Sequence, residues 1–238
     1  MTLSVFHQCY KQRKATTEAI KSFRKFYPTA NYFLVSDGGD DFSDIALDLK
    51  CHYYHDPVHL GYRDHTHSSG IYGMTKDEVL LWLSRFRLAC ELNDTKYVMM
   101  MEDDVLIRGE IEIPDDTEFS GFALPGNKFQ PEFINYLKSK YDVNFNVDYY
   151  GTGGGSIFNA ETFLKNYDKV TQIFKSEFDF MKNNLCGNLG WVDVWMPIYY
   201  FLSGKKYTQN YNLTEIPHNP NWETGNHSIV HQYKKYYV

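Results

Sequence analysis

Three consecutive acids interrupt an apolar stretch near the middle of the chain, and they constrain the fold more than any other feature. The stretch is KYVMMMEDDVLIR, residues 96–108, in which Glu102, Asp103 and Asp104 separate two apolar runs. An unbroken apolar run is typical of a buried strand. Because isolated carboxylates are costly to bury, we expect the strand over 97–101 to surface at Glu102 and to point its acids at a positively charged group.

Acids at the end of a strand suit a metal site. In open α/β sheets, ligands bind in the crevice at the carboxyl ends of the strands. Carboxylate oxygens favour Mg²⁺ or Mn²⁺, with substrate phosphates completing the shell. The alternative is a strand that ends in a solvated acidic turn, and the motif is too short to decide by itself. The apolar residues on both sides of the acids make a plain surface turn the weaker interpretation.

The segment YVMMMEDDVLI resembles the DXD-type metal motif of GT-A glycosyltransferases. In that family, acids at the end of a central strand hold a divalent cation that bridges the diphosphate of a nucleotide-sugar. The resemblance implies Mn²⁺ (or Mg²⁺) as the cofactor, with Glu102 and Asp104 as metal ligands and Asp103 between them at the donor. The first position is Glu where the family usually has Asp.

Composition narrows the class of protein. The 238 residues are enough for one large domain or two small ones, and 43% of them are hydrophobic, as in an ordinary globular protein. The net charge of −6 argues against a nucleic-acid partner, which normally requires a basic surface. We find no signal peptide and no apolar run long enough for a membrane span. The four separated cysteines indicate reduced thiols, so we expect a cytoplasmic location.

The order of the expected elements predicts the sheet. Strands over 3–6, 32–35 and 51–54 alternate with helices over 15–26 and 42–49. This β-α-β-α-β order predicts parallel strands with right-handed crossovers. Later in the chain we expect a capping box at Thr75–Glu78 with a helix to about residue 92, an exposed hairpin or turn over 111–120, a strand over 121–124 and a helix over 133–140.

The turn SDGGDD, residues 36–41, follows the second expected strand. Its glycines permit a sharp turn, and Asp40 or Asp41 can cap the next helix. Asp37 comes first after the strand, so we expect it to face the crevice. The turn resembles the DDGS-type turn of GT-A enzymes, which implies that Asp37 binds the base or ribose of the nucleotide. The alternative is a purely structural turn.

Basic residues after this turn are candidates for the donor phosphates. Residues 55–73 form a long aperiodic stretch with four histidines, but their spacing fits no standard zinc site. Loops of this length are usually functional or mobile. The GT-A resemblance implies that Arg63 contacts phosphate and that Arg85, on the following helix, reaches the donor.

Two later segments are candidates for the acceptor side. Residues 151–155 hold four glycines, which permit close backbone approach, and the alternative is a bulged strand. The resemblance implies that this segment shapes the acceptor pocket. Asp193 is the lone acid on the apolar helical face of WVDVWMPIYYF. It suits the first turn of a helix, and the resemblance implies instead that it is the general base.

The carboxyl-terminal segment completes the resemblance. GT-A enzymes often supply a third metal ligand from a histidine near the end of the chain, and IVHQYKKYY places His231 in that position, with His227 as the second choice. The resemblance also implies that Lys234 neutralises the diphosphate. The alternative is a polar terminus that frays.

The resemblance covers nearly the whole chain as a series of ordered motifs. It implies one α/β domain over 1–238 with the GT-A (Rossmann-like) fold, in which a mixed, mostly parallel central sheet is flanked by helices. Residues 1–108 would bind the nucleotide-sugar, and residues 109–238 would bind the acceptor and supply the metal-binding tail. The short, tyrosine-rich chain also resembles the glycosyltransferases of large algal viruses, which implies the cytoplasm of a host cell.

The expected function is metal-dependent transfer of a sugar from a UDP- or GDP-sugar to a hydroxyl of a glycan or glycoprotein, with inversion. Two alternatives use some of the same residues. A nucleotidyltransferase also places paired acids at a strand end, although it would normally carry a basic, glycine-rich loop early in the chain. A non-catalytic carbohydrate-binding module would need no divalent cation.

Overall fold

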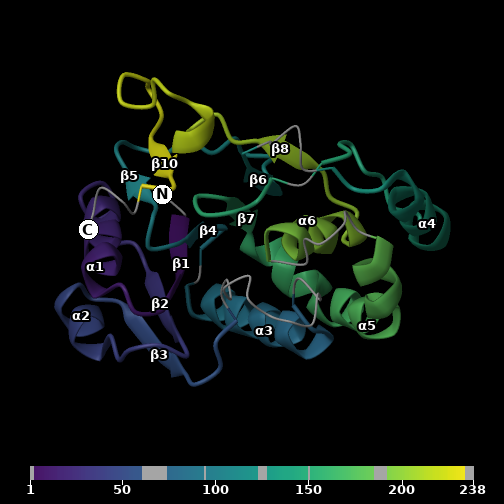
Figure 1. Ribbon diagram of the computed structural model, residues 1–238, viewed down its shortest axis with the longest axis horizontal. Coiled ribbons are helices and arrows are strands. Elements are labelled where there is room, and N and C mark those ends of the chain that lie inside the picture. The colour runs from purple at the N-terminus through teal and green to yellow at the C-terminus, as the bar shows by residue number, and fades with distance from the viewer. Residues whose placement is uncertain are drawn as a thin grey trace.

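A seven-stranded sheet forms the centre of the computed structural model, which describes residues 3–60, 74–93, 95–122, 128–149, 151–184 and 192–233 (Figure 1). The strand order is β3-β2-β1-β4-β7-β6-β8. Strands β3, β2, β1 and β4 are parallel to one another, whereas β7 is antiparallel to both β4 and β6. The predicted mixed, mostly parallel sheet is therefore confirmed. The strands are β1 (Leu3–Cys9), β2 (Tyr32–Asp37), β3 (His52–Asp56), β4 (Tyr97–Met101), β6 (Phe119–Gly121), β7 (Ile157–Asn159) and β8 (Tyr207–Gln209).

Helices cover both faces of this sheet (Figure 1). On one face, α3, α5 and α6 pack over Phe6, Val98 and Phe158 in the larger apolar core. On the other face, α1 packs over the alternate residues Val5 and Met99. Successive residues of a strand point to opposite faces, which explains why these strands are apolar throughout. The helices are α1 (Arg13–Arg24), α2 (Ser43–Asp48), α3 (Lys76–Asn93), α4 (Pro131–Tyr141), α5 (Ala160–Asn184) and α6 (Val192–Leu202).

The amino-terminal half follows the predicted β-α-β-α-β order, with strand ends that extend two or three residues beyond the predicted ones. The capping box at the start of α3 is also confirmed. The backbone N–H of Thr75 donates to Glu78 Oε2 over 2.8 Å, and the backbone N–H of Glu78 donates to Thr75 Oγ1 over 3.3 Å. None of the helices in the described ranges has the length and apolar character that crossing a membrane requires.

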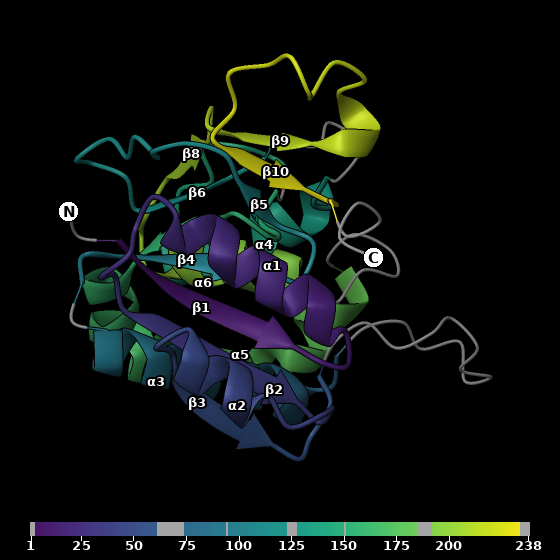
Figure 2. The ribbon, with the colours of Figure 1, turned by 90° about the vertical axis from the view of Figure 1, so that its left-hand side faces the viewer.

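A separate three-stranded sheet joins the end of the described chain to its middle. Its order is β5-β10-β9, with β5 at Leu106–Ile107, β9 at Leu213–Glu215 and β10 at Ile229–His231. A short 3₁₀ turn, η1 (Ile216–His218), follows β9. Because β5 comes just after the three acids, its antiparallel pairing with β10 carries the tail to the acid motif. Figure 2 shows β9 and β10 lying above α1 with their arrowheads pointing the same way as that of β1.

The prediction for residues 111–124 is partly wrong. The acids at 115 and 116 do lie in an exposed turn, but no hairpin forms over 111–120. Ile111 and Thr117 are each only 1% exposed, and the backbone N–H of Ile111 donates to the hydroxyl of Tyr27. Strand β6 also begins two residues before the predicted strand. The segment is partly buried because Ile111 and Ile113 pack in the apolar core beneath the sheet, which the polar composition of the segment does not reveal.

Candidate functional site

The turn after β4 points the middle acid of the three in a different direction from the two outer ones. Met101 is buried, and a turn closed by the Val105 N–H to Glu102 carbonyl hydrogen bond of 3.1 Å follows it. Asp103 points back into the protein, where it accepts hydrogen bonds from Thr16 Oγ1 over 2.6 Å and lies 3.2 Å from His7 Nε2. The middle acid therefore anchors the turn, and the two outer acids remain at its open side.

His231 is brought to these outer acids by strand pairing. In the β5–β10 ladder Val230 lies opposite Leu106, so the next residue of β10 faces the acid turn. Beyond β10, the backbone N–H of Tyr233 donates to the carbonyl of Asp104 over 2.7 Å. Backbone bonds on both sides thus fix the segment that carries His231.

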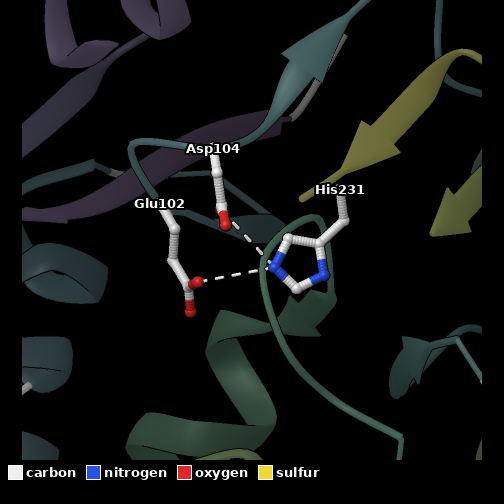
Figure 3. Close-up of side chains that lie close together, drawn as sticks. All are labelled: Glu102, Asp104 and His231. Atoms are coloured by element: carbon white, nitrogen blue, oxygen red, sulfur yellow. Dashed lines mark ion pairs between the residues drawn. The ribbon is translucent and has the colours of Figure 1, made fainter. Parts of the chain in front are cut away.

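The three side chains converge on one point. His231 Nε2 lies 3.5 Å from Glu102 Oε2 and 3.5 Å from Asp104 Oδ1 (Figure 3). One ligand atom from each residue lies within 4.8 Å of the others. Atoms that share one ion at about 2.1 Å lie about 3–4 Å apart, so the cluster already has roughly the spacing of a ligand set. The Glu102 side chain is 37% exposed, which leaves the cluster open on one side.

A fourth residue, Glu215, contacts the other ring nitrogen of His231, Nδ1. It lies beside His231 in the parallel β9–β10 register, and its Oε1 is 3.0 Å from His231 Nδ1. A carboxylate on Nδ1 favours the tautomer in which Nδ1 carries the proton and Nε2 is available as a ligand. Glu215 was not among the predicted site residues, because nothing local in the segment TEIP distinguishes it from an ordinary surface acid.

The electrostatic balance around His231 favours a cation. Burial lowers the pKa of His231, but hydrogen bonds with Glu102 and Glu215 and the charge of Asp104 raise it more, so the pKa lies well above its ordinary value of 6.5. Three carboxylates thus surround one imidazole in a mostly buried site. Two carboxylates and an imidazole nitrogen form a donor set that suits Mn²⁺ or Mg²⁺. The residues present therefore fit the cofactor expected from the sequence.

The glycine-rich segment forms a wall of this cluster. A Cβ atom on Gly154 would lie 2.6 Å from Val105 Cγ2 and 2.9 Å from His231 Cδ2, which is too close for any other residue. The backbone of this segment therefore lies close to the side chains of Val105 and His231, whereas its approach to an acceptor stays a prediction.

Asp193 lies near the same cluster, in the first turn of α6. The hydroxyl of Thr152, in the glycine-rich segment, donates to the backbone carbonyl of Asp193 over 2.8 Å. Burial and then the charge of Glu102, with a smaller contribution from Glu215, raise the pKa of Asp193 from 3.8 to about 7, against the opposing effect of His231. These charges are felt at Asp193 because the start of α6 lies beside the acid turn.

The residues predicted to contact the donor have different surroundings. Asp37 is 1% exposed, and its carboxylate accepts hydrogen bonds from Arg85 Nη1 over 2.6 Å and from the backbone N–H of Leu60. Arg85 is also buried and donates to Asp56 Oδ2 and to the carbonyl of Val58. The side chains of Asp37 and Arg85 are thus bonded to each other at the ends of β2 and β3. Arg63 and Lys234 lie outside the described residues.

Comparison of sequences finds no relative: no protein-family model and no curated protein matches the chain. Comparison of structures finds many. The galactosyltransferase LgtC, solved in complex with donor and acceptor sugar analogs, superimposes with a TM-score of 0.55 at 13% identity, and the match covers 96% of this chain and 86% of LgtC. An active-site mutant of LgtC gives a TM-score of 0.58. GlyE, a glycosyltransferase of Streptococcus pneumoniae TIGR4, gives 0.51 at 11% identity, with 98% of this chain and 55% of GlyE covered. The chain therefore has the GT-A glycosyltransferase fold that its motifs predict.

Proposed function

We propose that this protein is a metal-dependent glycosyltransferase that moves a sugar from a UDP- or GDP-sugar to a hydroxyl of a glycan or glycoprotein. The observation that carries the proposal is the convergence of Glu102, Asp104 and His231 at the end of β4. The same fold in LgtC is found with analogs of a donor and an acceptor sugar. Carboxyl ends of strands are where ligands bind in open α/β sheets.

In this proposal, Glu102, Asp104 and His231 hold Mn²⁺ or Mg²⁺, and Glu215 orients the imidazole. The ion, when bound, supplies positive charge to the leaving diphosphate. Asp193 accepts the proton of the acceptor hydroxyl while the hydroxyl oxygen attacks the anomeric carbon. A carboxyl group with a pKa of about 7 is well matched to that task near neutral pH. A single displacement from the face opposite the leaving group inverts the anomeric configuration.

The donor side is proposed to include the expected residues in two roles. Arg63 and Lys234 contact the phosphates, as the resemblance implies. Asp37, Arg85 and Asp103 hold the strand ends on which the nucleotide lies, because their hydrogen bonds within the protein support a positioning role. The whole chain acts as one domain, with donor binding in residues 1–108 and acceptor binding in residues 109–238.

A cytoplasmic location is also part of the proposal. Among the described residues, Cys9, Cys51 and Cys90 are free thiols. Burial raises the pKa of Cys9 far above the ordinary thiol value, which makes it unreactive. Unpaired, inert thiols are typical of proteins in a reducing compartment.

The test is a screen of UDP- and GDP-sugars for slow hydrolysis with and without Mn²⁺. Metal-dependent release of the nucleoside diphosphate from one sugar supports the proposal, and Asp104→Ala should abolish it together with metal-dependent nucleotide binding. Asp116→Ala, which changes an exposed acid in the turn at 115–116, is the matched control. Transfer of a nucleotidyl group would instead identify a nucleotidyltransferase, and sugar binding without hydrolysis would indicate a binding module. Retention in the transfer product would overturn the single displacement.

A further inference from the structure

A second hollow lies beside the large sheet, away from the metal cluster. Four of its lining residues lie between β5 and β6, two are in β8, three lie between β8 and β9, and one each is in β6 and β7. They are Glu112, Ile113, Pro114, Thr117, Thr208, Gln209, Asn210, Tyr211, Asn212, Ser120 and Ile157. Its volume is about 380 Å³, within the range of small-molecule sites. Figure 2 shows β6 and β8 on the left, whereas the arrowheads of β1 and β10 point to the right, and β10 ends at His231.

Strand β9 separates the two sites. Asn212 lines the hollow just before β9 begins, and Glu215, at the end of β9, contacts His231. The three residues of β9 span about 10 Å at the usual rise of a strand. The hollow is therefore distinct from the metal cluster.

A buried hydroxyl in this hollow finds no partner within the described part of the chain. Thr117 is 1% exposed, and its Oγ1 has no hydrogen bond to any described residue. Nearly all buried polar groups in native proteins are hydrogen-bonded, and leaving one unsatisfied is destabilising. Because Thr117 lines the hollow, a polar ligand there supplies the missing bond.

The other lining side chains indicate which polar ligand fits. The side chain of Tyr211 is 83% exposed, which is unusual for a large aromatic residue. Pro114 adds a second apolar surface to the hollow. Hydrogen-bonding groups come from Thr208 and Gln209. An exposed aromatic ring with hydroxyl and amide groups around it matches a sugar ring, which has a face of C–H bonds and a rim of hydroxyls.

The charges of the lining residues favour a neutral sugar over an acidic one. Among the described lining residues the only ionisable acid is Glu112, and there is no lysine, arginine or histidine. A phosphate or a uronic acid would therefore meet a carboxylate and no cation. We propose that this hollow binds a neutral sugar ring of a glycan, with Tyr211 against the C–H face and Thr117 bonded to a ring hydroxyl. This site needs neither metal nor nucleotide, so it does not depend on the proposed transfer activity.

The test measures binding of lactose, cellobiose and maltose by saturation-transfer NMR and calorimetry, in EDTA and without nucleotide. We expect at least one disaccharide to bind, with glucuronic acid binding more weakly. Tyr211→Ala should weaken binding about tenfold, the effect of one lost aromatic contact. Thr117→Val should also weaken it, while the sugar-free protein becomes no less stable, because the hydroxyl it removes is unsatisfied.

Tyr54→Ala is the matched control, since Tyr54 is an exposed tyrosine on β3 at the other edge of the sheet. Loss of binding in Tyr211→Ala but not in Tyr54→Ala supports the site. Metal-dependent hydrolysis of the donor by Tyr211→Ala should match the wild type, which separates this site from the catalytic one. The proposal is overturned if no neutral disaccharide binds at tens of millimolar, if Tyr211→Ala and Thr117→Val bind like the wild type, or if glucuronic acid binds equally well.

Discussion

Replacing Asp193 by Asn should make the protein more stable at high pH, while it abolishes most of the proposed activity. Burial, then the charge of Glu102, raises the pKa of Asp193 from the ordinary 3.8 to about 7. Between these two values the folded chain holds a proton that the unfolded chain has lost. Wild-type stability therefore falls as the pH rises from about 4 to 7, and the full cost remains above pH 7.

The magnitude follows from the shift. About three pKa units at 1.36 kcal/mol each give an upper value of about 4 kcal/mol. Because the Asp193 side chain is partly open to solvent, we expect about 2–4 kcal/mol. Asn has the same shape without the charge, so Asp193→Asn should exceed the wild type by this amount at pH 8 and by little at pH 4.

The assay is urea unfolding of both proteins in EDTA at pH 4 and pH 8. Asp179→Asn, which changes an exposed acid on α5, is the control and should show no pH-dependent difference. An equal stability difference between Asp193→Asn and the wild type at both pH values would refute the reasoning. In the transfer assay, losing a general base should lower the rate about 10²–10⁴-fold with little change in donor affinity. A variant that is both stabilised and inactive would show that the charge is retained for function.

Three further changes test the surroundings of the cluster. Glu215→Gln should weaken Mn²⁺ binding, measured by calorimetry, about 10–100-fold, because it removes the charged partner of His231 Nδ1; unchanged affinity would contradict the orienting role. Removing residues 231–238 should weaken Mn²⁺ and nucleotide binding together, and wild-type donor affinity in the shortened chain would exclude His231 as a ligand. Arg85→Met should lower the free energy of unfolding by about 3–5 kcal/mol, because it leaves Asp37 and Asp56 buried without their cation; a loss below 1 kcal/mol in urea would argue against a buried ion-pair network.

The acid motif was predictable because the residues that define it are adjacent in the sequence. Five apolar residues followed by three acids predict a strand that ends at a charged site, and β4 ends at Met101 as expected. The three acids lie in the turn after β4, so strand alternation does not predict which of them points inward. The partners of Asp103, His7 and Thr16, were not predictable, because they lie 96 and 87 residues earlier in the chain.

The role of the tail could not be derived from its own residues. The segment IVHQ does not by itself indicate that β10 pairs with β5, which is a two-residue strand more than a hundred positions earlier. The assignment of His231 therefore rested on family resemblance. Family resemblance did not identify Glu215, because its role depends on lying beside His231 in the parallel β9–β10 register.

For Asp37, the place along the sheet could be predicted from the sequence, but the surroundings of its side chain could not. Asp37 does lie at the carboxyl end of the second strand, but as the last residue of β2 and not after it. Its side chain was expected to face the crevice, whereas its carboxylate is buried against Arg85 of α3. A strand end specifies where a residue lies along the sheet, and the side chains of neighbouring elements decide whether its charge is exposed or paired.

The two sheets are the reason why metal binding and folding should be coupled in this protein. Glu102 and Asp104 follow β4 of the large sheet, whereas His231 ends β10 of the small one. A cation bound by all three side chains therefore links the sheets at one point. A ligand that binds only the folded form stabilises it by about 2.7 kcal/mol at one hundred times its dissociation constant. Because β5 and β10 share only two paired positions, this link adds substantially to the small set of bonds that hold the tail in place. Mn²⁺ should thus protect backbone amides of β10 from hydrogen exchange more than those of β1, which is already buried at the centre of the large sheet.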